Sequence, residues 1–352
     1  MSSGNTKRLS AAEALEAESA GQKRVLLTGA QVTGELHLGN YLGAIRHWVK
    51  LQEEGECFFF LADLHAITCP QVPAHLRQNT LNTLAQFLAC GLDPTRSCLF
   101  LQSSVHGHTD LAWILGCLTP LGQLFRMTQF KSKSQGKEGI GSGLLYYPIL
   151  MAADILLYNA HQVTIGEDQK QHLELARDLA VRFNQTYSDT FNVPEPHVGK
   201  VGGRIYSLQS PTQKMSKSDP NPKGILFLAD PPETIRKKFQ SAVTDSGQGI
   251  YRSKTKPGVT NLIHIFGALT DQSLESIEKD YGSRSYAEFK DIVAEATIRI
   301  LAPFREAYRR HLEDKEGLLK ILREGGEKAS HKAQKTLSKV CRKVGFVDLR
   351  SF

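Results

Sequence analysis

Hydrophobic and polar positions along this chain alternate between short apolar runs and longer stretches with helical spacing. The runs Lys23–Gly29, Phe58–Ala62 and Cys98–Gln102 have the length of strands and end in glycine or polar residues. Between them, Tyr41–Gln52 and Pro73–Leu92 carry apolar side chains three or four residues apart, as one face of a helix requires. Strands that alternate with helices predict an α/β fold whose parallel sheet is covered on both faces.

The middle of the chain extends this pattern. A further strand is expected at Val163–Ile165, and the Gly-rich segment Gln135–Gly143 predicts a loop. Helices are expected at 109–133 with a break at Thr119–Pro120, at Pro148–Tyr158 with the proline in the first turn, and at 168–184. A hairpin is expected at Val198–Leu208, and a mobile loop at Ser210–Gly224, which is rich in Pro, Ser, Lys and Asn.

After Pro231 the pattern is entirely helical. The expected helices are 232–243, 260–268, 273–280, 286–311, 315–323 and 327–343. The positive charge lies in the same part of the chain: residues 1–222 carry 19 Lys/Arg against 19 Asp/Glu, and residues 223–352 carry 24 against 17. A basic lobe beside a neutral one indicates contact with a large polyanion, although a solvated helical surface has the same composition.

Length and composition narrow the possible classes of protein. A chain of 352 residues with 41% hydrophobic content has room for two globular domains. No apolar run is long enough to span a membrane. The six cysteines form no CxxC pair and no zinc set, so most are expected to be small buried side chains in a reducing compartment. The first 22 residues lack an apolar core and contain three glutamates, which predicts a flexible extension instead of a targeting signal.

The first candidate motif, Gly34–Tyr41, follows the first predicted strand. In a parallel sheet this turn is where nucleotides bind, since a glycine such as Gly39 lets a phosphate or ring approach the backbone. His37 could donate a hydrogen bond to phosphate oxygens. A tight turn with an ordinary helix cap is the alternative.

The second motif is Lys214-Met215-Ser216-Lys217-Ser218, in the predicted mobile loop. Two lysines three residues apart suit the charge that develops on a departing pyrophosphate. A solvated basic loop is the alternative.

The third motif is an apolar helical stripe with one carboxylate. Tyr147, Met151 and Asp154 are spaced i, i+4, i+7 and share a helix face. A carboxylate among apolar side chains needs a hydrogen-bond donor. A flat apolar ligand with one N–H, an indole, would supply it, but a protein group could do the same.

Together, the first two motifs resemble the two signatures of class I aminoacyl-tRNA synthetases, about 180 residues apart. That family usually has histidine where Asn40 stands, and its tryptophan-specific branch tolerates asparagine there. Three segments are similar to the tryptophanyl-tRNA synthetase family almost throughout: Arg126–Lys133, Gly143–Tyr158 and Val163–His172. The resemblance runs from about Arg24 to about Phe346. It implies a Rossmann-like catalytic domain at 23–209, a mobile loop at 210–222 and a helical tRNA-binding domain at 223–352.

The resemblance also implies roles for individual residues. The ATP contacts would be Gln31, Val32 (where the family usually has proline), Thr33, Gly39, Asn40, Gly166, Glu167, Asp168, Ile205, Lys214, Met215, Ser216, Lys217 and Ser218. The tryptophan contacts would be Asp154, Tyr147, Met151 and Gln169, with His65 and Gln129 as second contacts. His37, Lys214 and Lys217 would act in catalysis, and Lys133 would reach phosphate. Mg²⁺ would arrive with ATP, and no protein-bound metal is expected.

The implied reaction joins L-tryptophan to AMP with release of pyrophosphate, then transfers tryptophan to a ribose 2′-hydroxyl at the 3′ end of tRNA(Trp). The helical region 223–345 would read the anticodon. A homodimer formed through the region after Gln102 is expected, in the cytoplasm or, alternatively, an organelle matrix. Three rivals remain open: a tyrosine-specific synthetase, a small-molecule adenylyltransferase, and a nucleic-acid-binding paralogue without catalysis.

Overall fold

The computed structural model describes residues 24–32, 34–136, 138–197 and 205–347, with the side chain of Glu167 excepted. The predicted N-terminal extension, Thr33 and most of the predicted hairpin therefore lie outside the described residues.

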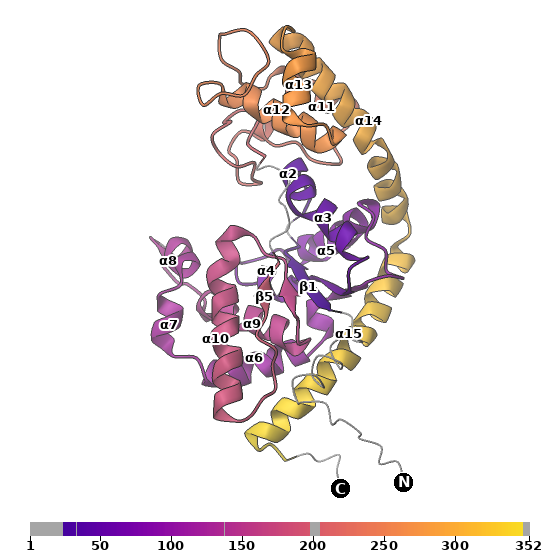
Figure 1. The fold of residues 1–352 in the computed structure, drawn as a ribbon. Helices are drawn as coiled ribbons and strands as arrows, with labels where there is room; N and C mark the ends of the chain where they lie inside the picture. The colour runs from indigo at the N-terminus through magenta and orange to yellow at the C-terminus, as the bar shows by residue number, and fades with distance from the viewer. Residues whose placement is uncertain (1–23, 33, 137, 198–204, 348–352) are drawn as a thin grey trace, which may run out of the picture.

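A five-stranded parallel sheet forms the centre of the molecule, in the order β3-β2-β1-β4-β5 (Figure 1). The strands are β1 Val25–Ala30, β2 Glu56–Leu61, β3 Cys98–Leu101, β4 Gln162–Val163 and β5 Glu195–Pro196. The four predicted strands and their parallel pairing are confirmed. The two-residue strand β5, which precedes the expected hairpin, was not predicted because it carries no apolar run.

Helices surround the sheet and extend into a second lobe. Those of the sheet region are α2 Leu38–Asn40, a π-helical turn η1 Tyr41–Ile45, α3 Arg46–Leu51, α4 Asp63–Ala66, α5 Pro73–Ala89, η2 Gln102–Ser104, α6 Gly107–Cys117, α7 Leu121–Phe125, α8 Thr128–Ser134, α9 Ser142–Leu157, η3 Glu167–Gln169 and α10 Lys170–Thr186. Those that follow are η4 Pro222–Gly224, α11 Pro232–Gln240, α12 Pro257–Thr270, α13 Leu274–Tyr281, α14 Tyr286–Glu313 and α15 Lys315–Val344.

The alternation of side chains along each strand separates two hydrophobic cores. Phe59 and Leu61 of β2 face a core completed by α3, α5 and the second lobe. Phe58 and Phe60 of the same strand face a core completed by α6, α9 and α10. The sheet is therefore buried on both faces, as the sequence pattern predicts for parallel strands.

Helix α9 begins earlier than the sequence suggests. It starts at Ser142, so Pro148 lies inside the helix and not in its first turn. The extra turn is held by Leu145, which is partly buried and packs against the same core as the rest of the helix. Burial of this apolar side chain extends the helix past the point where proline favours a start.

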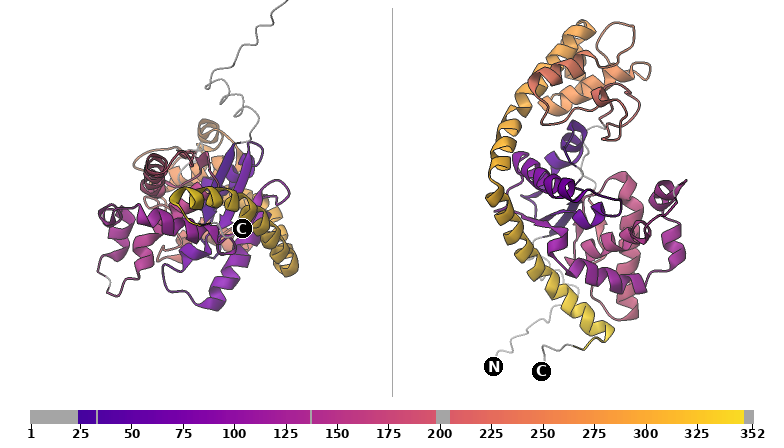
Figure 2. Two further views of the ribbon diagram at one scale, coloured as in Figure 1. Left: turned by 90° about the horizontal axis from the view of Figure 1, so that it is seen from below. Right: turned by 180° about the vertical axis from the view of Figure 1, so that it is seen from behind.

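Helix α15 is one helix, although two were expected on either side of Gly325–Gly326. A Cβ at Gly325 would overlap the backbone carbonyl of Leu99 in β3, so glycine lets the helix lie directly on the edge strand. Cys98 Sγ also lies 3.2 Å from the carbonyl oxygen of Gly325. Helices α14 and α15 together follow one side of the molecule from the second lobe to the far end of the sheet (Figures 1 and 2).

The basic excess lies on α15 and not on the lobe formed by α11–α14. Residues 223–314 carry 14 Lys/Arg against 13 Asp/Glu, whereas residues 315–352 carry 10 against 4. Within the predicted helical domain, the positive excess therefore lies on the helix that packs against β3.

None of the helices within the described ranges is long and apolar enough to cross a membrane. All six cysteines are free, and the expected burial holds only in part, since Cys69 and Cys117 are exposed.

Candidate active site

The site lies where the strand order reverses. Strand β1 has β2 on one side and β4 on the other, so the chain segments leaving the carboxyl ends of β1 and β4 diverge. The first motif follows β1, and Gly166 follows β4 after two residues. Both predicted nucleotide-binding segments therefore begin at the same edge of the sheet.

His37 and Asn40 cap the helix that starts at the first motif. The backbone N–H of Asn40 donates to His37 Nδ1 and the backbone N–H of His37 donates to Asn40 Oδ1, both at 3.2 Å. Because Nδ1 accepts, the ring proton of neutral His37 resides on Nε2. Asparagine at position 40 thus has a structural role: it completes a reciprocal capping box.

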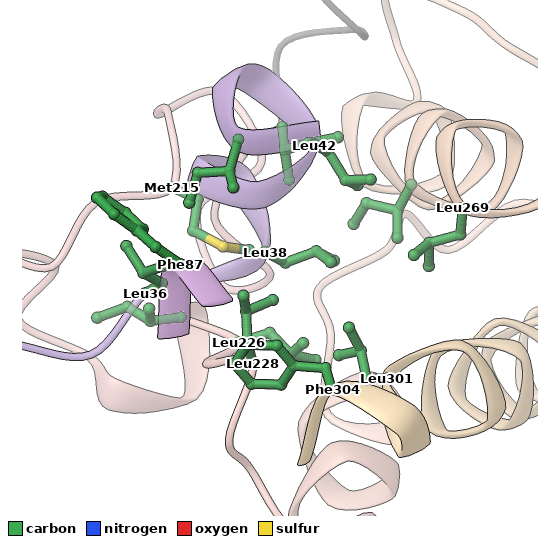
Figure 3. Packing of buried hydrophobic residues seen from close by; sticks show 14 of the residues in the cluster. Leu36, Leu38, Leu42, Phe87, Met215, Leu226, Leu228, Leu269, Leu301 and Phe304 are labelled. Carbon is green, nitrogen blue, oxygen red and sulfur yellow. The ribbon is translucent and has the colours of Figure 1, made fainter. Parts of the chain in front are cut away.

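The lysine-rich loop is anchored beside this helix by an apolar side chain. Met215 is buried and packs with Leu36 and Leu38 (Figure 3). Its backbone N–H donates to the carbonyl of Ile205 at 3.0 Å. Ile205 is itself buried. The buried side chains of Met215 and Ile205 therefore hold the loop in place. Lys214 remains exposed and Lys217 partly exposed.

Electrostatics shows that the two motifs meet. Burial lowers the pKa of His37 to about 4, assisted by the positive charges of Lys217 and Lys214. Burial also lowers the pKa of Lys217 to about 8, opposed by the nearby carboxylate of Glu35. The partly buried Lys217 and the exposed Lys214 beside a neutral imidazole form a site suited to phosphate oxygens.

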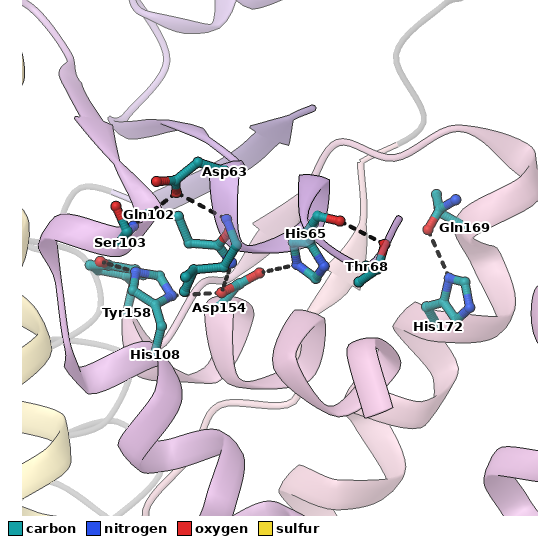
Figure 4. A network of polar contacts seen from close by, with 11 residues as sticks. Asp63, His65, Thr68, Gln102, Ser103, His108, Asp154, Tyr158, Gln169 and His172 are labelled. Carbon is teal, nitrogen blue, oxygen red and sulfur yellow. Dashed lines mark hydrogen bonds and ion pairs between the residues drawn. The ribbon is translucent and has the colours of Figure 1, made fainter. Parts of the chain in front are cut away.

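Asp154 of α9 lies at the centre of a buried hydrogen-bond network (Figure 4). Its Oδ1 accepts from Gln102 Nε2 at 2.8 Å and from His108 Nδ1 at 2.6 Å, and its Oδ2 accepts from His65 Nε2 at 2.8 Å. On the other side of its ring, His108 Nε2 lies 2.9 Å from the hydroxyl of Tyr158. Burial alone would raise the pKa of Asp154, but the hydrogen bonds from His108 and His65 outweigh it and hold the pKa at about 2.

A second chain of contacts runs from His65 towards α10. The rings of His65 and Tyr147 meet edge to face at 6.0 Å. The hydroxyl of Tyr147 lies 3.1 Å from His172 Nε2, and His172 Nδ1 lies 2.7 Å from Gln169 Oε1. Lys133 Nζ lies 5.4 Å from the ring centroid of Tyr147. Four of the residues expected near the amino acid, and the lysine expected to reach phosphate, are therefore linked to one another.

The other residues expected to bind the amino acid or ATP differ in how deeply they are buried. Among the described residues, no hydrogen bond joins the side chain of Gln129 in α8 to this network. Met151 is half-buried and packs against the core that contains α9. Gln31 is exposed while Val32 is buried. Exposed Asp168 accepts from Gln169 Nε2 at 2.8 Å.

The remaining residues expected to contact ATP lie in the segment after β4 and in the lysine-rich loop. Gly166 is exposed, and Glu167 begins the short helix η3, so both lie just beyond β4. The hydroxyls of Ser216 and Ser218 lie 2.9 Å apart, beside the two lysines.

Sequence reasoning missed four polar residues of the network: Gln102, His108, Tyr158 and His172. Two of them had a local signal, because Tyr158 lies one helical turn after Asp154 and His172 lies three residues after Gln169. Gln102 follows the carboxyl end of β3, which is also where functional side chains gather. His108 had no such signal, since its contact with Asp154 spans 46 residues.

Within the described residues, no group of three or more His, Cys, Asp or Glu side chains is arranged to hold a metal ion.

The chain matches known proteins over most of its length. A family model described as tRNA synthetases class I (W and Y) matches residues 19–302. The tryptophan–tRNA ligase of Clostridium tetani is 54% identical over 327 residues, which cover 92% of this chain and 96% of that protein.

Two solved structures resemble the fold closely. Tryptophanyl-tRNA synthetase from Mycoplasma pneumoniae superimposes with a TM-score of 0.82 at 38% identity, covering 93% of this chain and 99% of the other. The enzyme from Campylobacter jejuni, complexed with ADP and tryptophan, gives a TM-score of 0.81 at 36% identity, covering 92% and 100%.

Proposed function

The chain belongs to the class I tRNA synthetases of the tryptophan and tyrosine group, and we propose that it acts as a tryptophan–tRNA ligase. It activates L-tryptophan with ATP and transfers the amino acid to the 3′-terminal adenosine of tRNA(Trp). The observation that carries the choice of amino acid is Asp154, an ionised carboxylate with no exposed surface in an otherwise apolar helix. The identity to tryptophan–tRNA ligases supports the same choice.

The first step is an in-line displacement at phosphorus. A carboxylate oxygen of tryptophan forms a bond to the α-phosphorus of ATP, and the bond from that phosphorus to the bridging oxygen of pyrophosphate breaks. No side chain acts as nucleophile, so positioning and charge stabilisation supply the catalysis. Mg²⁺ enters as a partner of ATP and neutralises part of the phosphate charge.

The lysines and His37 act on the leaving pyrophosphate. Lys214 and Lys217 supply positive charge, and the Nε2–H of neutral His37 donates a hydrogen bond to a phosphate oxygen. These groups lie on two segments that the burial of Met215 holds together. Their effect is largest when charge accumulates on the departing oxygen.

Tryptophan binds with its indole N–H donated to Asp154. Phenylalanine has no N–H, so it would leave a buried carboxylate short of a partner. In this proposal Gln169, Tyr147 and Met151 contact the bound amino acid, and His65 is a second contact.

tRNA is the third partner, and α15 supplies the positive charge that meets its phosphates. From Lys328 to the end of this helix there is no acidic residue. Lys328, Lys335, Lys339 and Arg342 are exposed along its length. The lobe of α11–α14 carries almost no net charge, so its proposed contact with the anticodon depends on shape and base contacts more than on charge.

A homodimer is the proposed assembly. Three large apolar side chains are exposed on neighbouring helices α6 and α7: Trp113 at 69%, Leu121 at 67% and Phe125 at 51%. Exposed large apolar side chains are a feature of protein interfaces. The proposed location is the cytoplasm, since the relatives come from bacteria and tRNA is a substrate.

Amino-acid-dependent ATP–pyrophosphate exchange tests the proposal. Exchange is expected with tryptophan and not with phenylalanine or tyrosine. Exchange driven by tyrosine would retain the enzyme class and refute the role of Asp154. No exchange with any amino acid would favour a paralogue without catalysis.

A further inference from the structure

The acceptor capacity of Asp154 is almost exhausted by the protein itself. A carboxylate has about four acceptor sites, two on each oxygen. Gln102 and His108 fill both sites on Oδ1, and His65 fills one on Oδ2. One acceptor site, on Oδ2, is left for a ligand.

The direction of each donor in this network is determined by the carboxylate. An ionised carboxylate only accepts, so His108 must carry its proton on Nδ1. Its Nε2 then accepts from the hydroxyl of Tyr158, and both of these side chains have no exposed surface. Gln102 is likewise forced to present its NH₂ group to Asp154, which leaves its buried Oε1 without a hydrogen-bond partner among the described groups.

We propose that His108, oriented by Tyr158 and assisted by Gln102, is a positioning residue for amino-acid specificity, because it occupies Oδ1 of Asp154 and leaves a single acceptor site on Oδ2 for the one N–H of the substrate. The inference rests on the proposed role of Asp154 as the indole acceptor. His108 contacts the carboxylate and not the substrate.

Loss of the His108 contact has a specific consequence. With one acceptor site on Oδ1 vacated, the carboxylate is held only by Gln102 and His65, so the open site on Oδ1 can accept from a phenol hydroxyl or from water. The pocket would then bind tryptophan less tightly and would discriminate less strongly against tyrosine. Chemistry on the bound amino acid would be little affected, so KM should change more than kcat.

Two substitutions of similar size separate this role from simple packing. In His108→Asn the amide nitrogen stands close to the position of Nδ1 and keeps the hydrogen bond to Asp154. In His108→Gln the longer side chain carries its amide near the position of Nε2, keeps the contact with Tyr158 and loses the one with Asp154. Both remove the ring, so a loss of packing would affect them alike.

The measurement is pyrophosphate exchange with tryptophan and tyrosine as a function of pH. His108→Gln is expected to raise KM for tryptophan by roughly tenfold or more, the loss of one hydrogen bond to a charged group, and to lower the tryptophan-to-tyrosine ratio of kcat/KM. The low-pH limb of kcat/KM should move to higher pH, because Asp154 loses a donor that favours its charged form. His108→Asn should stay close to the wild type in all three respects.

Equal behaviour of the two variants, or a change in kcat alone, would overturn the proposal. Tyr158→Phe provides a second route if His108→Gln fails to fold: it removes only a hydroxyl, and an unchanged tryptophan-to-tyrosine ratio in this variant would also count against the proposal. Wild-type protein that shows no tryptophan-dependent exchange would instead refute the proposed function, so the two failures can be distinguished.

Discussion

Individual side chains of the site are tuned by burial as well as by their charged neighbours. His37 remains neutral at physiological pH because burial and two lysines disfavour its protonated form. Lys217 is close to its own titration point because burial disfavours its charged form and Glu35 only partly compensates. His37 is therefore a neutral donor, and Lys217 is a cation that loses its proton easily. The activity of the site should depend on pH in the mildly alkaline range.

The activity of the free enzyme towards ATP should fall as pH rises through about 8. The charged form of Lys217 binds phosphate, and its pKa of about 8, below the ordinary 10.5, means that this form is present below pH 8 and lost above it. The pH dependence of kcat/KM for ATP in pyrophosphate exchange measures this. Lys217→Arg, which keeps its charge throughout the range, should lack the limb near pH 8. The same limb in both proteins would assign it to another group.

The sequence predicted the functional motifs of the site better than the hydrogen bonds that connect its residues. The His37 and Lys214–Ser218 motifs were visible as local patterns, and the structure brings them together through Met215. The partners of Asp154 were not visible, because Gln102 and His108 belong to other elements and reach Asp154 only when β3 and α6 pack against α9.

At the scale of elements, α15 shows where tertiary packing overrides local preference. Two adjacent glycines predict a helix break, since glycine is unfavourable within a helix. The helix continues because Gly325 lies against the backbone of β3, where any side chain would collide. Edge strand β3 is covered in this way, which removes an exposed row of backbone groups. The helical spacing of apolar residues predicted the remaining long helices, whereas the short strand β5 has no alternation of apolar and polar residues.

Gly325→Ala should destabilise the protein although alanine favours helix. The added methyl would overlap the carbonyl of Leu99, and overpacking of this kind costs roughly 1–3 kcal/mol of unfolding free energy. Urea unfolding followed by circular dichroism measures the change. The matched control is Gly326→Ala, whose methyl would meet mainly the rotatable hydroxyl of Ser104 and should be nearly neutral. Equal effects of the two changes would argue against the close contact.

At the scale of the whole molecule, the long helices join two regions of different charge. Helix α14 packs against α5 of the sheet region as well as against α11 and α12 of the second lobe, and α15 continues from it onto the sheet. The lobe is nearly neutral, and α15 carries the positive excess. A tRNA bound to this protein would therefore find its strongest electrostatic attraction beside the catalytic domain.

Reversing charge on α15 should weaken tRNA binding and its dependence on salt. Lys335→Glu with Lys339→Glu removes two exposed cations, and each lost phosphate contact should reduce the slope of log K against log salt by about 1. Filter binding of tRNA between low and moderate salt measures the slope. Lys279→Glu on α13 is the control, an exposed cation on the neutral lobe, and tryptophan-dependent exchange should stay unchanged in all variants. An unchanged slope in the double variant would exclude α15 as a phosphate contact.

The most direct test of the account is calorimetric binding of tryptophan and of its analogue with sulfur in place of the indole N–H. The two ligands match in shape and differ in one donor, which Asp154 is proposed to accept. Tryptophan should bind at least roughly tenfold more tightly, because the analogue leaves the fourth acceptor site of a buried carboxylate unfilled, and Asp154→Asn should narrow the difference. Equal affinities in the wild-type protein would contradict the proposed recognition of the indole.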